Sequence, residues 1–138
     1  MKLDGGIPSS LHNAASSAQE LERAGYTGGW TAETSHDPFL PLLLAAEHTS
    51  TLEIGTSIAV AFARNPMTLA NTAWDLQSYS NGRFILGLGS QIKPHITKRF
   101  SMQCVARHKL ETIFHKLFIL SKGSSFDNPV SAIRLIVE

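Results

Sequence analysis

The feature that most constrains this chain is a repeated pattern, in which an apolar run of strand length is followed by a segment with helical spacing. We expect strands over 3–7, 28–32, 52–62 and 83–88. The expected helices run from 11 to a stop at Gly25, from 38 to 46, from 66 to a stop at 81–82, and from 105 to 120. Each unit takes about 25 to 30 residues, the size of a βα step. Strict alternation predicts an α/β fold with a parallel sheet and outer helices. The periodicity leaves two closures open: a doubly wound open sheet, or part of an eight-stranded barrel.

Local signals at the helix starts agree with this pattern. Asp37 precedes Pro38 and Asn65 precedes Pro66, and in each pair the polar side chain can accept from the first free amides while proline fits the first helical position. Ser10 and its neighbour Ser9 can cap the first helix in the same way. Helix capping alone therefore accounts for Asp37 and Asn65.

Composition narrows the class of protein. A chain of 138 residues suffices for one compact domain, and 43% hydrophobic with 17% charged residues is typical of globular proteins. Twelve basic against eleven acidic side chains give no broad electrostatic footprint, so neither nucleic acid nor a membrane is expected as a partner. No signal peptide is apparent, and the apolar run at 39–46 is too short to span a bilayer. With Cys104 as its single cysteine the chain is expected in the reducing cytoplasm.

Polar residues gather directly after or near the predicted strands. They are Asp4 with Gly5 and Gly6, then residues 33–37, then residues 63–65, and then Gly89, Ser90, Gln91 and His95. The carboxyl ends of parallel strands meet at one edge of the sheet, where α/β proteins bind ligands. His36 and Asp37 offer a pair able to handle a proton, and the glycines allow a flat ligand to approach the backbone. No dinucleotide, phosphate-loop or nucleophile-elbow motif and no metal-spaced set is found, so no metal is predicted.

The order and spacing of several short motifs carry a family resemblance. They are Asp4-Gly5-Gly6, Thr31-Ala32-Glu33-Thr34, His36-Asp37-Pro38-Phe39, residues 55–66, Gly82-Arg83-Phe84 and Leu86-Gly87-Leu88-Gly89. Together they resemble the amino-terminal half of a luciferase-like monooxygenase, in particular the branch of oxidoreductases that use coenzyme F420, a deazaflavin. The likeness covers about residues 1–100 and weakens over 101–120.

The resemblance implies a partial (β/α)8 TIM barrel of about four βα units, with residues 1–122 as its amino-terminal part and 123–138 as a divergent tail. It implies coenzyme F420, or alternatively FMN, at the carboxyl ends of the strands, with hydride passing between the ring and a small organic substrate. His36 and Asp37 match the catalytic positions beside the reactive ring. Ser57 and Ile58 match an end-of-strand bulge with a nonprolyl cis peptide bond. The remaining implied cofactor contacts are Asp4, Ala59, Gly89, Ser90, Gln91 and His95.

Length sets a second expectation. A complete barrel takes about 250 residues, and four strands leave two open edges that invite pairing with another chain. The chain is thus either the first half of an oxidoreductase, inactive without the carboxyl-terminal half, or a truncated noncatalytic fragment that self-associates through its sheet edges.

Several of these residues also have simpler roles. Glu33 would pair with a lysine or arginine of a neighbouring loop, and Arg64 would be a solvated charge. The basic stretch around His95, with Lys98 and Arg99, suits plain surface as well as an anion contact. In the helix predicted over 105–120, the ionisable residues suit a solvated face better than a metal site; they are His108, Glu111 and His115.

Overall fold

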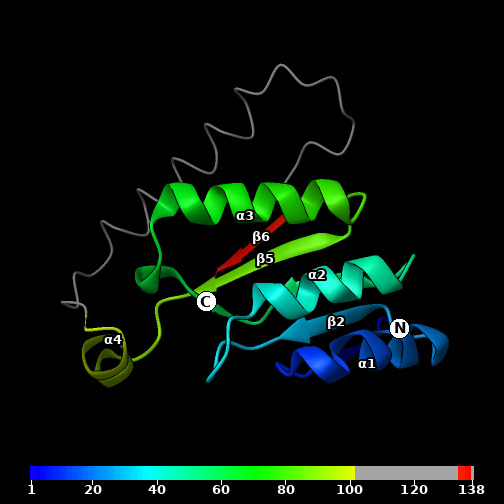
Figure 1. Ribbon diagram of the computed structural model, residues 1–138, viewed down its shortest axis with the longest axis horizontal. Helices are drawn as coiled ribbons and strands as arrows, with labels where there is room; N and C mark the ends of the chain where they lie inside the picture. Colours follow the sequence, from blue (N-terminus) through cyan, green and yellow to red (C-terminus); the bar gives the residue numbers. More distant parts are fainter. Residues whose placement is uncertain (102–133, 138) are drawn as a thin grey trace, which may run out of the picture.

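The computed structural model describes residues 1–101 and 134–137. Up to residue 89 strands and helices alternate as the sequence predicts, apart from the division of one strand, whereas the helix Lys93–Arg99 and the strand Arg134–Val137 were not predicted (Figure 1). The elements are β1 (Asp4–Gly6), α1 (Leu11–Arg23), β2 (Gly28–Thr31), α2 (Phe39–His48), β3 (Glu53–Thr56), β4 (Ala59–Val60), the 3₁₀ turn η1 (Ala61–Ala63), α3 (Pro66–Tyr79), β5 (Phe84–Gly89), α4 (Lys93–Arg99) and β6 (Arg134–Val137). The helix predicted over 105–120 lies outside the described residues.

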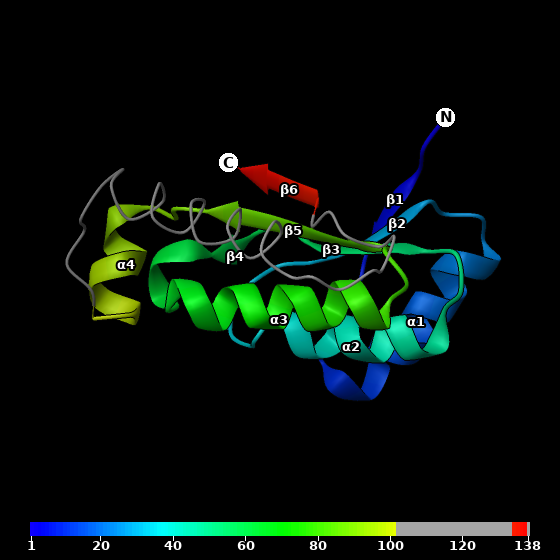
Figure 2. The ribbon, with the colours of Figure 1, turned by 90° about the horizontal axis from the view of Figure 1, so that it is seen from above.

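All strand pairs in the sheet are parallel. β1 pairs with β2 and β2 with β3, while β3 and β4 pair with successive parts of β5. β6 also pairs with β5. Helices α1, α2 and α3 lie on one face of the sheet (Figure 2), and the strands point toward the end of the molecule where α4 lies (Figure 1). This arrangement confirms the predicted parallel sheet with outer helices.

The single strand predicted over 52–62 is divided in two. Gly55 lies opposite Ile85 and Ala59 lies opposite Leu88. Between these two pairs the chain advances by four residues from β3 to β4 but by only three along β5. One extra residue in a strand pair is a β-bulge. The bulge contains a cis peptide bond between Ser57 and Ile58, which confirms the bond implied by the family resemblance. The apolar run gave no sign of the break, because residues on both sides of it are buried.

The core lies between the sheet and the three outer helices. Ala14 and Ala18 of α1, which have the spacing of one helical face, are both fully buried. A second, smaller cluster joins α4 to the end of β4 through Val60, Phe62 and Ile96. None of the helices among the described residues is long and apolar enough to cross a membrane.

The last described strand comes from the segment that the sequence left as a divergent tail. β6 lies parallel to β5 with Arg134 opposite Ile85. The Arg134 guanidinium donates to Glu53 Oε1 at 2.6 Å and holds the pKa of Glu53 below its usual range. Residues 134–137 thus contribute to the same sheet as the amino-terminal strands.

Candidate functional site

The loop between β2 and α2 is fixed at both of its ends. The Thr31 hydroxyl, at the end of β2, donates to the Pro38 carbonyl at 2.8 Å. Asp37 Oδ1 accepts from the amides of Phe39 and Leu40 at 2.8 and 3.3 Å. These two bonds confirm the capping role predicted for Asp37. They hold its Oδ1 atom against the first amides of α2. Ser10, by contrast, makes no side-chain cap bond at the start of α1.

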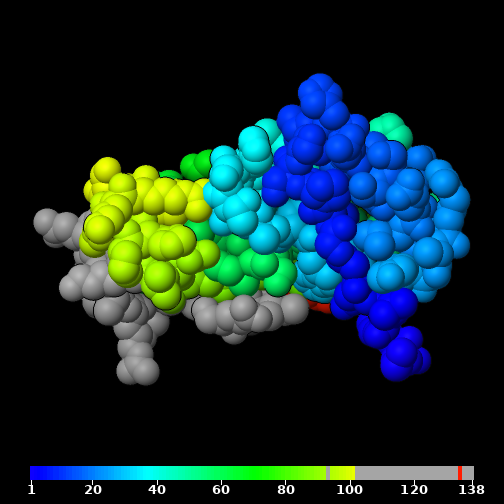
Figure 3. Space-filling model, turned by 90° about the horizontal axis from the view of Figure 1, so that it is seen from below, coloured from blue at the N-terminus to red at the C-terminus, as the bar shows by residue number. Residues whose placement is uncertain are grey.

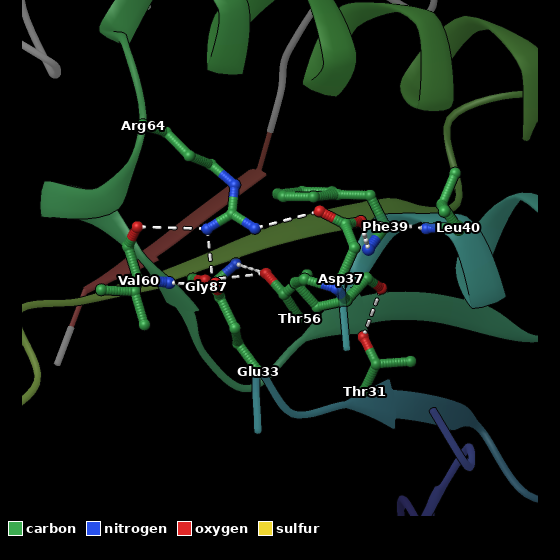
Figure 4. Close-up of polar contacts among 10 residues, drawn as sticks. Thr31, Glu33, Asp37, Phe39, Leu40, Thr56, Val60, Arg64 and Gly87 are labelled. Atoms are coloured by element: carbon green, nitrogen blue, oxygen red, sulfur yellow. Dashed lines mark hydrogen bonds and ion pairs between the residues drawn. The ribbon is translucent and has the colours of Figure 1, made fainter. Parts of the chain in front are cut away.

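An ion-pair network, with Glu33 buried and Asp37 exposed, joins this loop to the segment after β4 (Figure 4). Glu33 Oε2 accepts from the Val60 amide at 2.6 Å and from Arg64 Nη1 at 2.5 Å. Arg64 Nη2 lies 3.1 Å from Asp37 Oδ2, and the guanidinium stacks 5.1 Å from the centre of the Phe39 ring. Glu33 therefore pairs across neighbouring loops as predicted. The prediction of a solvated Arg64 is wrong, because its side chain is only 18% exposed and has carboxylate partners on two sides.

The bulge lies beside this network. The Glu33 amide donates to the Ile58 carbonyl at 3.3 Å, and the Ser57 amide donates to the Thr31 carbonyl at 2.7 Å. The Ser57 side chain is exposed and Ile58 is half-buried. The loop that carries His36 and the bulge at Ser57 are thus joined through backbone hydrogen bonds.

Thr56 and Gly87 fix the sheet just before the bulge. The Thr56 hydroxyl donates to the Gly87 carbonyl at 2.7 Å and accepts from the Gly87 amide at 2.9 Å. A Cβ atom at Gly87 would overlap the Thr56 carbonyl oxygen, so only glycine fits there. Sequence reasoning found Gly87 only as part of a motif and missed this contact.

The end of β5 forms the third part of the site. A side chain at Gly89 would strike the Ile58 side chain, so the two strands are in close contact behind the bulge. Ala59 and Gly89 are both buried in the sheet, whereas Ser90 and Gln91 are partly exposed. Gln91 has a φ of 56°, and this left-handed residue turns the chain from β5 into α4.

A hollow of about 460 Å³ opens between the β2–α2 loop and α4. It is lined by Glu33, Thr34, Ser35, Gln91, His95 and Arg99. Figure 3 shows the yellow surface of the α4 region bordering the cyan surface of the β2–α2 loop and α2. Gln91 and His95, two of the predicted contacts, therefore lie around the same space as the residues just before His36. Thr34 and Ser35 belong to the polar segment found in the sequence but were not predicted as contacts, since hydroxyl residues in a loop carry no specific signal.

Two predicted residues lie differently from the others. His36 is exposed in the loop beside Asp37. Asp4 lies opposite Gly28, the first residue of β2, and Gly28 lies opposite Glu53, the first residue of β3. The structure therefore separates Asp4 from the rest of the site, because β1 begins at this residue and Asp4 belongs to the amino end of the sheet.

The carboxyl edge thus presents exposed hydroxyl, imidazole and amide groups on a rigid frame. Such groups can hydrogen-bond the polar edge of a flat ligand, and His36 can also exchange a proton. Within residues 1–101 and 134–137, no group of three metal-binding side chains is found. In parallel α/β folds this edge of the sheet is where ligand sites generally lie.

Comparison with known proteins identifies the family. The sequence model of the luciferase-like monooxygenases matches residues 2–111, and the chain belongs to this family. Uncharacterized protein Rv1360 of Mycobacterium tuberculosis is 74% identical over 102 residues, which are 74% of this chain and 30% of that protein. A second protein of the same organism, Rv3520c, is 37% identical over 78 residues, which are 56% of this chain and 22% of that protein. Its name describes it provisionally as a coenzyme F420-dependent oxidoreductase. The chain spans about a third or less of these relatives.

Solved structures of the family have the same fold. Monooxygenase RslO1 of Streptomyces bottropensis superposes with a TM-score of 0.77 at 20% identity, over 87% of this chain and 43% of that one. The coenzyme F420-dependent tetrahydromethanopterin reductase of Methanopyrus kandleri superposes with a TM-score of 0.72 at 16% identity, over 99% and 46%. The oxygenating constituent of 3,6-diketocamphane monooxygenase from Pseudomonas putida, in complex with FMN, gives 0.71 at 18% identity, over 88% and 39%. The described fold is therefore part of a TIM barrel.

Proposed function

We propose that this chain forms the amino-terminal wall of a flavin-type oxidoreductase site, in which a coenzyme F420 or FMN ring lies against the bulge at Ser57 and Ile58. The observation that carries the proposal is the convergence of three strand ends at one edge. The Glu33 amide joins the β2–α2 loop to Ile58, and the hollow brings Ser35 next to Gln91 and His95. Family membership supports this choice of ligand.

The residues present fit such a ring. The neighbouring hollow, whose volume lies within the range of about 300–1,000 Å³ that is usual for small-molecule sites, leaves room for other parts of a ligand whose ring lies at the bulge. Ser57 is exposed at the bulge, and Ser90 and Gln91 are partly exposed at the end of β5, so they offer donors and acceptors to the edge of a ring. The bulge and the end of β5 are rigid, because Ile58 packs directly on Gly89.

When bound, F420 or FMN would supply hydride transfer to or from a small organic substrate. His36 would orient the substrate oxygen or exchange its proton, since it is exposed and lies in the loop fixed by Asp37. Asp37 would act by positioning that loop, because one of its oxygens caps α2 and the other pairs with Arg64. The single cysteine favours the reducing cytoplasm as the compartment.

Absorbance in the flavin and deazaflavin bands of the purified chain, followed by titration with each cofactor, tests this proposal. We expect saturable micromolar binding that is lost in the double variant His36→Ala, Ser57→Ala. The matched control is His48→Ala, Ser50→Ala, a pair of exposed residues at the other end of the sheet. Equal affinity of the two double variants would contradict the proposed site.

A second candidate function follows from the sheet edges. Within the described residues, β1 pairs only with β2 and β6 pairs only with β5, and unpaired parallel edges favour association with another chain. In this alternative the chain is a noncatalytic association module. Sedimentation equilibrium separates the two: a concentration-dependent dimer without cofactor binding supports association, and a monomer excludes it.

A further inference from the structure

We propose that the hollow between the β2–α2 loop and α4 is a subsite for an anionic group of a ligand, a phosphate or a carboxylate, held by Arg99, His95 and the hydroxyl groups of Thr34 and Ser35. The inference rests on the proposed function in one respect: the ring of the ligand would lie at the neighbouring bulge. The anion site itself follows from the lining of the hollow.

The α4 wall of the hollow is a fixed surface. Ile96 is 1% exposed and packs on Val60 and Phe62, so α4 is attached to the end of β4. His95 and Arg99 are four residues apart and therefore lie on the same face of this helix. Both line the hollow. Two groups able to carry positive charge thus face one space from a helix whose orientation is set by packing.

The opposite wall contributes hydroxyl groups and a carboxylate that already has an arginine partner outside the hollow. Thr34 and Ser35 line the hollow from the β2–α2 loop. Glu33 is the one carboxylate in the lining, and its Oε2 already accepts from Arg64 and the Val60 amide. Arg64, which Glu33 shares with Asp37, therefore offsets part of this negative charge from outside the hollow, whereas Arg99 brings a positive charge into the lining from the opposite wall.

The distribution of charge along the sequence favours the same sign. No aspartate or glutamate stands between Asp75 and Glu111, whereas Lys98 and Arg99 lie within this stretch. Among the ion pairs found within the described residues, the cations are Lys2, Arg64 and Arg134. Arg99 stacks on the Phe100 ring, at 5.0 Å, which leaves its N–H groups available at the edge of the guanidinium.

This combination selects the chemical class of the group. A guanidinium offers paired N–H donors that match the oxygens of a phosphate or carboxylate, and hydroxyl groups can donate to the same oxygens. A cationic group would be repelled by Arg99, and a neutral one would not gain from its charge. An anion is therefore the occupant that the lining favours.

The test uses the full chain with four probes: inorganic phosphate, coenzyme F420, FMN, and riboflavin, which has the same ring system as FMN without the phosphate. We expect Arg99→Gln to weaken the binding of inorganic phosphate about tenfold, as the loss of one charged hydrogen bond predicts. Lys98→Gln is the matched control, because Lys98 is the adjacent cation of α4 and does not line the hollow; we expect a change below about twofold. Equal binding of phosphate by the two variants, or no saturable phosphate binding, would overturn the subsite.

The flavin probes identify the source of the anion and separate the two proposals. If phosphate competes with FMN and Arg99→Gln weakens FMN but not riboflavin, the group belongs to the cofactor. If phosphate binds together with FMN, the group belongs to a substrate. Arg99-dependent phosphate binding without binding of either flavin or of coenzyme F420 supports the subsite and contradicts the proposed function. If both flavins bind and Arg99→Gln has no effect on phosphate binding, the proposed function is supported and the anion subsite is contradicted.

Discussion

The two ends of the sheet use the same kinds of charged residue for different purposes. At the amino end, Glu22 Oε1 accepts from the amides of Ser50, Thr51 and Leu52 and from the Thr51 hydroxyl, at 2.6–3.0 Å. Arg83 donates to the carbonyls of Ala46, Thr49, Leu52 and Ser80 and to the Thr49 hydroxyl, at 2.8–3.0 Å. Glu22 and Arg83 thus satisfy backbone groups that the end of a helix or a turn leaves free, whereas Glu53 at the same end pairs with Arg134 and Lys2.

At the carboxyl end the charges pair with one another as well as with the backbone. Arg64 bridges Glu33 and Asp37, and the same three side chains also bond the amide and the carbonyl of Val60 and two amides at the start of α2. The remaining polar side chains of the loop, Thr34, Ser35 and His36, stay exposed. The comparison teaches that Glu22 and Arg83 fix loops and helix ends at the amino end, whereas the carboxyl end combines an ion-pair network with exposed polar side chains. This division is the one expected of a barrel whose ligand site lies at the carboxyl edge.

The largest effect on stability is expected from Arg83→Met. This change leaves several partly buried carbonyls without a donor, and we expect the free energy of unfolding to fall by about 3 kcal/mol. Urea denaturation followed by circular dichroism measures it. Arg23→Met serves as the control, because Arg23 is exposed and contacts only Gln19, at 3.4 Å. Equal losses in the two variants would contradict the structural role of Arg83.

A smaller loss of stability with a larger loss of ligand binding is expected from Arg64→Met. Glu33 would keep only its bond to the Val60 amide, and we expect unfolding to become easier by about 2 kcal/mol. The freed loop should also lower the affinity for FMN, while Arg83→Met, measured where it remains folded, leaves that affinity unchanged. Arg64→Lys should restore part of both properties. If Arg83→Met and Arg64→Met weaken FMN binding alike, the division between the two ends does not hold.

Glu22→Gln is expected to lower stability by about 1 kcal/mol at neutral pH, since the amides lose a charged acceptor. Burial alone would raise the pKa of Glu22, but the bonds from Thr51, Leu52 and Ser50 lower it from 4.5 to about 2. Because the folded-state pKa lies below the unfolded one, the carboxylate stabilises the fold above about pH 4.5 and this contribution is lost as the pH falls toward 2. Urea denaturation of both proteins between pH 7 and pH 2 should show their difference vanish on acidification; a constant difference would contradict it.

The smallest effect compares two helix starts. The Asn65 side chain accepts from the Met67 amide at 2.8 Å, so Asn65→Ala should cost about 1 kcal/mol. Ser10 makes no such bond, so Ser10→Ala should change the melting temperature little. Differential scanning calorimetry of both variants checks this, and a larger shift for Ser10→Ala would contradict it.

The strands and helices over residues 1–90 could be predicted because local signals agree with the fold. Apolar spacing located α1, and proline after a capping residue located the starts of α2 and α3. The division between β3 and β4 could not be read from periodicity, since Ile54, Ala59 and Val60 are buried alike on both sides of it. Only the family resemblance pointed to the bulge, and the register of the strands confirms it.

The candidate site was predicted only in part. Ser57, Gln91 and His95 reach the carboxyl edge as expected, whereas Asp4 lies at the other end. The Glu33–Arg64 pair was foreseen only as an unspecified partner for Glu33. A residue's partner 31 positions away in the sequence carries no local signal, so the network of Figure 4 had to be found in three dimensions.

The sequence by itself determined the alternation of strands and helices and the family, because these depend on the spacing of residues along the chain. The tertiary structure decided which partners the charged residues find. Glu22 binds the amides of a turn, Arg83 binds carbonyls at the end of a helix, and Arg64 lies between Glu33 and Asp37. The physical reason is that an ion pair or hydrogen bond acts over a few ångströms of space. Which residues come that close is set by the packing of the helices on the sheet.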